Sequence, residues 1–181
     1  MGSPKVLVAY GTKNGSTAGI ADIVVAALRE AGADAEAVPA GAVRSVDGYD
    51  AVVLGGALYA NRWHRDARVF ARRHARALRG RPVWLFSSGP LDVSADVRPI
   101  PPVPQAAKAA RLLDAAGHAT FGGRLTDEAK GFVARAMVRN GHGGDFRNPG
   151  RIALWSQDIA DRLRDRQAQE QAGGPAARQR T

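Results

Sequence analysis

The chain has 181 residues, a formal net charge of +9 and no cysteine. Without cysteine it forms neither disulfides nor thiolate-ligated metal centres, so any redox chemistry requires a bound cofactor. The length suits one domain, and the 45% hydrophobic content predicts a folded chain with a sizeable core. No apolar run reaches the roughly 20 residues that span a bilayer. The first residues lack a secretory signal, so we expect a cytoplasmic protein.

Apolar periodicity predicts strands that alternate with helices along most of the chain. Strands are expected at residues 5–10, 34–38, 51–57, 82–87 and 118–121, and helices at 17–31, 65–79, 105–116, 126–139 and 149–164, with a Pro-rich loop at 88–104. This order favours an α/β doubly wound fold, in which a five-stranded parallel sheet carries helices on both faces. We expect one domain over residues 1–166 and a disordered tail over residues 167–181.

The positive charge gathers between Arg62 and Arg81, where eight arginines stand against a single acid, Asp66. At about 100° per residue, a helix here separates an apolar face from an arginine face. The apolar face holds Ala67, Phe70, Ala71, His74, Ala75 and Leu78, and the arginine face holds Arg65, Arg68, Arg72, Arg76 and Arg79. The segment indicates either an anionic partner or a compositional bias toward Arg and Ala.

If the arginine face from Arg65 to Arg79 has a partner, we expect an anionic membrane, contacted peripherally from its inner side. No nucleic-acid partner is expected, because the chain lacks a basic ribbon interleaved with aromatic residues and any known nucleic-acid module.

The loop after the first predicted strand offers the groups that hold a phosphate. Residues 10–17 read Tyr-Gly-Thr-Lys-Asn-Gly-Ser-Thr and place hydroxyls, glycines and backbone amides at a helix N-terminus. The loop lacks both the Gly-Lys-Ser/Thr of a Walker loop and the Gly-x-Gly-x-x-Gly of a dinucleotide site. The alternative is an ordinary turn in which Ser16 or Thr17 caps the helix.

The stretch from Val6 to Ile23 resembles the FMN phosphate signature of flavodoxins. It has an aromatic at Tyr10, a hydroxyl two residues later, and then a small residue, a threonine, an alanine and an aliphatic at the signature's spacing. The resemblance implies a flavodoxin-like fold and FMN as the cofactor. It implies that the phosphate is held by Thr12, Lys13, Asn14, Gly15, Ser16 and Thr17.

Later segments are similar to the menaquinone-dependent protoporphyrinogen IX dehydrogenases, a branch of the flavodoxin fold. The similar segments are residues 55–64 with the helix that follows, 85–90, and 122–148 with Trp155 in the last helix, so that the resemblance covers residues 5–164. It implies an FMN-dependent oxidoreductase that passes electrons from a small-molecule donor to a quinone or another acceptor.

The loops after the third and fourth predicted strands are expected to surround the flavin ring. Gly55 and Gly56 would let the ring edge approach the backbone. The expected contacts are Ala57, Leu58, Tyr59 and Ala60 after the third strand, and Ser87, Ser88, Gly89 and Pro90 after the fourth. Tyr59 or Trp63 is expected to cover one ring face, with core or rim packing as the alternative, favoured for Trp63. No tyrosine follows Ser87 closely, so the other ring face is expected to be open to a substrate.

The histidines are weak candidates for chemistry. His74 is expected in the core, because it falls on the apolar face of its helix. His64 lies beside the predicted flavin loop and is the candidate for proton handling, with packing as the favoured alternative. The four histidines are too scattered for a metal motif.

Two other functions stay open beside the oxidoreductase. A soluble flavodoxin-type carrier would use the same cofactor, but such carriers typically dock through acidic surfaces and this chain is basic. A non-catalytic protein of the same fold that has lost flavin is the second alternative. We favour the oxidoreductase.

Overall fold

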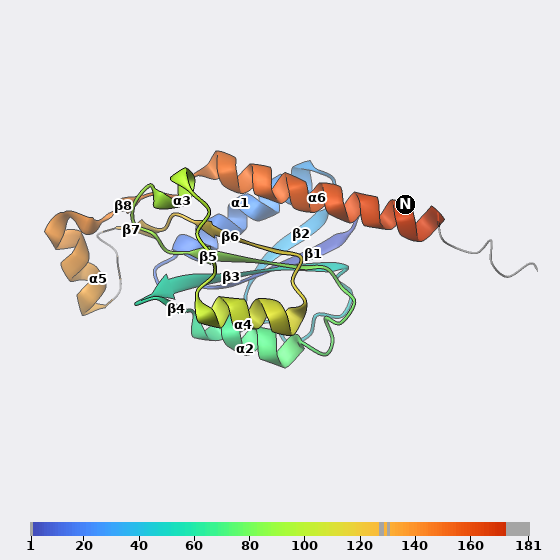
Figure 1. The fold of residues 1–181 in the computed structure, drawn as a ribbon, viewed down its shortest axis with the longest axis horizontal. Helices are drawn as coiled ribbons and strands as arrows, with labels where there is room; N and C mark the ends of the chain where they lie inside the picture. The colour runs from blue at the N-terminus through green and yellow to red at the C-terminus, as the bar shows by residue number, and fades with distance from the viewer. Residues whose placement is uncertain (1, 127–128, 130, 173–181) are drawn as a thin grey trace, which may run out of the picture.

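In the computed structural model, which describes residues 2–126, 129 and 131–172, five parallel strands form the central layer. The strands are β1 (Lys5–Gly11), β2 (Asp34–Pro39), β3 (Ala51–Tyr59), β5 (Val83–Ser88) and β6 (Gly117–Phe121), in the order β2-β1-β3-β5-β6. Two helices cover one face, α1 (Ser16–Glu30) and α6 (Pro149–Ala172), and two cover the other, α2 (Arg65–His74) and α4 (Pro104–Leu113) (Figure 1). The predicted doubly wound, five-stranded parallel sheet is confirmed.

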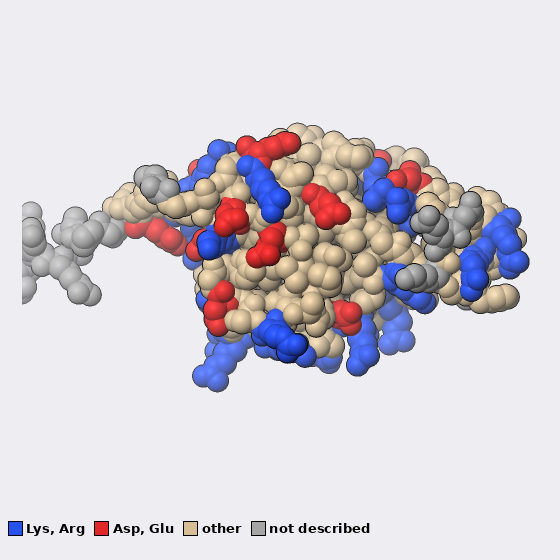
Figure 2. Space-filling model, turned by 180° about the vertical axis from the view of Figure 1, so that it is seen from behind, with Lys and Arg blue, Asp and Glu red and all other residues tan. Residues whose placement is uncertain are grey.

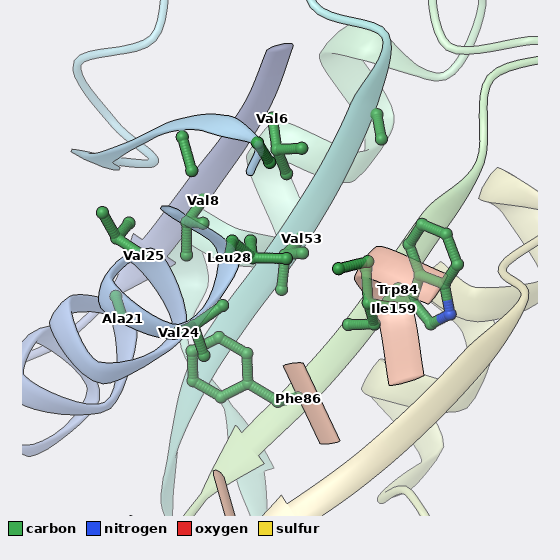
Figure 3. Close-up of a cluster of buried hydrophobic side chains, with 14 of the residues drawn as sticks. Val6, Val8, Ala21, Val24, Val25, Leu28, Val53, Trp84, Phe86 and Ile159 are labelled. Carbon is green, nitrogen blue, oxygen red and sulfur yellow. The ribbon is translucent and has the colours of Figure 1, made fainter. Parts of the chain in front are cut away.

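Each face of the sheet has its own hydrophobic core, because successive side chains of a strand point to opposite faces. In β1, Val6 and Val8 pack on the α1 and α6 side, whereas Leu7 and Ala9 pack on the α2 and α4 side. Figure 3 shows the first of these cores, where the valines of β1 and β3 lie against α1. This burial on both sides explains why the strands read as continuous apolar runs.

Two glycines in β3 each receive an aromatic ring. A Cβ on Gly55 would overlap the ring of Phe86, and a Cβ on Gly56 would overlap the indole of Trp63. Both rings are fully buried, with Phe86 0% and Trp63 1% exposed. The expectation that these glycines admit a flavin edge is therefore wrong, since core side chains fill that space. The favoured expectation of core packing for Trp63 is confirmed.

β3 continues into a hairpin that the periodicity did not predict. Its partner is the antiparallel strand β4 (Arg62–Trp63), and the turn consists of Ala60 and Asn61, with φ of 45° and 58°. Two-residue hairpins of this hand require positive φ at both turn positions. Alanine rarely adopts this conformation, so the turn has no clear signal in the sequence.

α2 is shorter than the predicted helix over residues 65–79. It ends at His74, and residues 75–80 form turns in which Arg79 N bonds to Arg76 O, a tighter three-residue spacing. The apolar face is nevertheless largely as predicted, with Ala67, Phe70, Ala71, His74 and Leu78 buried and Ala75 partly buried. His74 is confirmed as a core residue.

The segment from residue 122 to residue 145 departs most from the prediction. In place of a helix over 126–139, the structure has β7 (Arg124–Leu125), α5 (Phe132–Met137), η1 (Val138–His142) and β8 (Gly144–Asp145), with β7 and β8 paired. Residues 127, 128 and 130 lie outside the described residues. Gly131, at a φ of 100°, takes a conformation that no helix contains, which explains why α5 begins only after it. A short helix, α3 (Ser94–Val97), interrupts the Pro-rich loop.

The predicted disordered tail is wrong for residues 167–172, which continue α6. Arg166 pairs with Glu170 one turn later and donates to the carbonyl of Gly80, so this end of the helix is tied to itself and to the domain. Residues 173–181 lie outside the described residues. Among the described helices, none combines the length and the apolar composition that a membrane crossing requires.

His118 is a half-buried histidine at the outer strand. It lies on β6 with its Nε2 atom 2.9 Å from the hydroxyl of Ser87 on β5. Burial lowers the pKa of His118 from 6.5 to about 4, so the ring is neutral near pH 7. A neutral ring keeps one nitrogen as an acceptor and one as a donor, which suits a hydroxyl partner.

We predict that Gly55→Ala destabilises the protein by about 1–3 kcal/mol, because the new methyl group overlaps the buried ring of Phe86. Urea unfolding followed by circular dichroism measures the change. Gly150→Ala is the matched control, since its Cβ would meet only ordinary contacts on the exposed start of α6. The control variant should be unchanged or up to about 1 kcal/mol more stable. Equal unfolding of Gly55→Ala and wild type would contradict the packing argument.

A second prediction concerns pH. The folded-state pKa of His118 lies below that of the unfolded chain, so the unfolded chain binds the proton more readily. The contribution of His118 to the free energy of unfolding is therefore fully present above pH 6.5. It is lost as the pH drops toward about 4, by up to about 1.4 kcal/mol per pH unit. His118→Asn should show a smaller loss between about pH 7 and about pH 5 in urea unfolding. Identical pH slopes in the two proteins would show that folding does not suppress protonation of His118.

Candidate functional site

The carboxyl ends of the parallel strands meet at one edge of the sheet. The chain leaves β1 toward β2 on one side and returns to β3 on the other, so a crevice is expected beyond β1 and β3. The four segments that follow β1, β3, β5 and β6 all reach this edge, at the end where α5 lies (Figure 1). The predicted site residues come from the first three of these segments.

The loop between β1 and α1 presents backbone donors. Thr12 Oγ1 accepts a hydrogen bond of 3.0 Å from Gly15 N, which closes the loop on itself. Gly15 is the N-cap of α1 with a φ of 81°, and no side chain caps the helix. The alternative in which Ser16 or Thr17 caps the helix is therefore not what the structure shows. Uncapped first-turn N–H groups attract an anion.

Thr17 carries a polar atom that needs a partner. Its side chain is 0% exposed, and among the described residues its hydroxyl has no hydrogen-bond partner. Burying a hydroxyl without a partner costs about 1–3 kcal/mol. Such groups are rare in native proteins and call for a bound partner. Because Thr17 lies in the first turn of α1, a partner for its hydroxyl would have to bind at the β1–α1 loop.

Tyr59 covers the same loop from the end of β3. Its half-buried phenol oxygen is a hydrogen-bond acceptor for the backbone N–H groups of Asn14 and Lys13, while burial raises the pKa of Tyr59 above 10.0. The Lys13 Nζ atom lies 5.8 Å from the centre of the Tyr59 ring. Two backbone amides of the loop are therefore directed at the phenol oxygen, and the ammonium group of Lys13 lies beside the ring, which brings donors and a positive charge to this end of β3.

The hydroxyl of Ser16 ties three of the segments together. It lies 3.0 Å from the hydroxyl of Ser88 after β5, and it accepts a 2.8 Å hydrogen bond from Arg124 N after β6. Ser16 and Ser88 were both predicted at the site, and the structure brings them into contact. Arg124 was not predicted, although β6 ends at the same edge as the other strands and was a signal for it.

The segments after β3 and β5 are packed directly against each other. A Cβ on Gly89 would stand 2.7 Å from the Cβ of Leu58. Gly89 N donates to Phe121 O, and Gly123 N donates to Pro90 O at 2.8 Å. Glycine at position 89 is thus required by close approach, and the segment after β6 braces the one after β5.

Three predicted residues lie apart from this cluster. Ser87 is buried on the opposite face of the sheet from Ser88, where its hydroxyl contacts His118. Ala57 is also buried, and its carbonyl accepts a 2.9 Å hydrogen bond from His64 N. Ala60 is exposed in the hairpin turn.

His64 has a structural position at the start of α2. Its Nδ1 atom accepts from Asp66 N at 3.2 Å, so the imidazole caps the helix, and the ring packs on Gly11. Burial is the main cause that lowers the pKa of His64 below 6.5. In the neutral ring, the accepting Nδ1 leaves the proton on Nε2, which makes that atom a donor. Proton handling by His64 stays a prediction, and it would require loss of the cap before Nδ1 could take a proton.

Within the described residues, no cluster of three or more His, Asp and Glu side chains could hold a metal ion. The polar groups that the edge of the sheet brings together are hydroxyls, backbone amides and one lysine. These groups suit a phosphate ester that is bound without a metal ion.

Comparisons with known proteins agree with this geometry. A family model described as the flavodoxin domain matches residues 7–142. No curated protein matches the chain. Among solved structures, the rubredoxin:oxygen oxidoreductase of Desulfovibrio gigas has a TM-score of 0.62 at 13% identity, over 92% of this chain and 38% of that one. Our chain thus spans well under half of that protein.

Flavodoxins match over most of their own length. A flavodoxin from the domain Archaea has a TM-score of 0.60 at 14% identity, over 88% of this chain and 99% of that one. The two-electron reduced flavodoxin of Megasphaera elsdenii has a TM-score of 0.52 at 25% identity, over 64% and 84%. Since the family model matches most of the residues and the strand order agrees with it, the chain belongs to the flavodoxin domain family.

Proposed function

We propose that this protein is an FMN-dependent oxidoreductase that holds its cofactor at the carboxyl edge of the sheet. Flavodoxin domains bind FMN and transfer electrons. The observation that carries the proposal for this chain is the buried hydroxyl of Thr17, which has no partner among the described residues, at the uncapped N-terminus of α1. A phosphate ester supplies the acceptor that both the hydroxyl and the helix terminus lack.

The residues that would hold the FMN phosphate are those of the loop. Thr17 would donate its hydroxyl, Lys13 would supply a positive charge, and the backbone amides of Ser16 and Thr17 would supply further donors. The hydroxyls of Thr12 and Ser16 are already used within the protein, so their part is to fix the loop. Bound FMN would supply one- or two-electron transfer, and the chain would orient the cofactor and set its electrostatic environment.

The ring of the cofactor would lie near Tyr59, Leu58 and Gly89, where the segments after β3 and β5 meet. The segment after β5 continues as Ser88-Gly89-Pro90-Leu91 and offers no aromatic side chain for stacking. An unstacked ring face suits a donor that must approach it closely. This feature, together with the net charge of +9, supports a substrate-oxidising enzyme.

The finer proposal names the reactants. The resemblance of residues 55–64, 85–90 and 122–148 to protoporphyrinogen IX dehydrogenases supports a porphyrinogen as donor and a menaquinone-like acceptor. The second candidate is a soluble flavodoxin-type electron carrier, which the likeness to flavodoxins over most of their length favours. The two candidates differ in whether a small molecule or a partner protein takes the electrons.

We predict that Thr17→Val weakens FMN binding about ten- to hundred-fold, because a hydrogen bond to a charged group contributes about 1.5–3 kcal/mol. Quenching of flavin fluorescence on titration of the apoprotein measures the dissociation constant. Riboflavin, which lacks the phosphate, should bind both proteins equally weakly. Valine keeps the shape of threonine, so the fold should be retained.

The matched control is Thr126→Val, which removes an exposed hydroxyl outside the loop and should leave FMN binding unchanged. An apoprotein that binds no added FMN would contradict the proposed function. Equal loss for FMN and riboflavin in Thr17→Val would show that Thr17 supports the loop without meeting the phosphate.

We further predict that the reduced holoprotein is reoxidised by menadione under anaerobic conditions, with a rate that rises with menadione concentration. Each quinone takes two electrons and two protons and leaves as the hydroquinone. A porphyrinogen should reduce the oxidised holoprotein, and stopped-flow absorbance follows both half-reactions. Failure of both small molecules, with fast oxidation by a one-electron protein acceptor, would favour the carrier.

A further inference from the structure

We propose that the face formed by α2 and α4 docks on an anionic phospholipid bilayer and seats a lipid headgroup in the groove between the two helices. The proposal concerns a surface on the opposite side of the sheet from α1 and is independent of FMN binding. It rests on the state of the arginines, on the lining of the groove and on two buried polar atoms.

The arginines of this face differ from those of α6 in their ion pairing. Among the described residues, no ion pair is formed by Arg65, Arg68, Arg72, Arg73, Arg76 or Arg79. In α6, by contrast, Arg162 pairs with Asp158, Arg164 with Asp161, and Arg166 with Glu170. A compositional bias toward arginine would not separate the two helices in this way. The unpaired charges therefore mark a face that attracts anions.

Basic side chains gather along one edge of the molecule. Figure 2 shows lysine and arginine gathered along the side where α2 lies, while acidic groups are mixed with them on the α6 side. Lys108 and Arg111 of α4 add to the charge, and α4 itself contains no acid. Cations gathered on one face attract the phosphate layer of an anionic membrane.

A groove of about 210 Å³ lies between α2 and α4. Arg68, Arg72 and Lys108 stand around it, and Ala71, Ala109 and Leu112 form its apolar wall. Leu112 is 48% exposed, an unusual position for a large apolar side chain. Cations beside apolar surface suit a ligand with a phosphate next to hydrocarbon, which is the arrangement in a phospholipid. A nucleic-acid backbone offers the phosphate without the hydrocarbon, so the groove favours the lipid.

Two residues that line the groove, Arg68 and Gln105, each carry a buried polar atom with no partner among the described residues. The Nε atom of Arg68 and the Oε1 atom of Gln105 are buried, and the described part of the chain offers neither a hydrogen bond. The first needs an acceptor and the second a donor. A phosphodiester with a hydroxyl-bearing headgroup, such as that of phosphatidylglycerol, has both groups within one molecule.

Docking through this face leaves the carboxyl edge of the sheet accessible. In Figure 1, α2 and α4 lie beneath the sheet, while the segments after the strands gather at one end of it. A bilayer beneath α2 and α4 would therefore approach the cofactor edge from the side without covering it.

The test is co-sedimentation with vesicles of equimolar phosphatidylcholine and phosphatidylglycerol at low ionic strength, with pure phosphatidylcholine vesicles beside them. We expect binding to the anionic vesicles alone, and release at high salt. The double variant Arg72→Gln with Arg76→Gln should bind about 25-fold more weakly, about five-fold for each charge lost near the surface. The matched control, Arg162→Gln with Arg164→Gln, removes the same charge from α6 and should bind as wild type does.

The apolar contribution has its own pair of variants. Leu112→Asn at the groove should weaken vesicle binding, whereas Leu154→Asn, which changes a 68% exposed leucine on α6, should not.

Equal loss of vesicle binding in both arginine double variants would show that only net charge matters and would overturn the proposal. No binding of wild type to anionic vesicles, or binding to duplex DNA that depends on Arg72 and Arg76 while vesicle binding does not, would also overturn it. Circular dichroism verifies that each variant is folded.

Discussion

The close packing of aromatic rings on Gly55 and Gly56 determines the shape of the site as well as of the core. Trp63 reaches Gly56 only because the chain turns back through Ala60 and Asn61. This return fixes the end of β3, where Tyr59 meets the amides of the β1–α1 loop. It also delivers His64 to the start of α2, against Gly11. The packing of Trp63 on Gly56 therefore positions one wall of the edge proposed for the cofactor. A change in this packing would alter both the core and that edge.

The β1–α1 loop is organised around groups that the protein does not satisfy by itself. Thr12 and Ser16 use their hydroxyls internally, which makes the loop rigid before any ligand arrives. Thr17 is left with a buried hydroxyl and no partner among the described residues. An unsatisfied group lowers the stability of the ligand-free protein, and a ligand that satisfies it returns that free energy as affinity. Under the proposed function, this internal bonding and the unmet hydrogen bond would together favour an anion of the right size.

The sequence was sufficient where the decisive contacts are local. The strands, α1 and the buried face of α2 follow from apolar periodicity, which records burial at each position. It was insufficient where a residue's role depends on distant partners. The glycines of β3 look like an opening until Phe86 and Trp63 are placed on them. The contact of Ser16 with Arg124 joins residues 108 positions apart. Ala60 contradicts the usual preference for glycine or asparagine in its turn, so local propensity predicted no hairpin there.

Composition alone could not decide what the arginines do. α2 and α6 are both rich in arginine. Acids one turn away neutralise those of α6, whereas the acid of α2, Asp66, forms no ion pair with an arginine among the described residues. Exposed ion pairs add little to stability, but they remove the long-range field of the charges they join. The positive electrostatic field that remains therefore comes mainly from the arginines on the α2 side. This field acts over a long range, whereas the edge proposed for the cofactor is built from short-range hydrogen bonds. If both proposals hold, the two surfaces bind different anions, one through a fixed set of donors and the other through charge density and a groove.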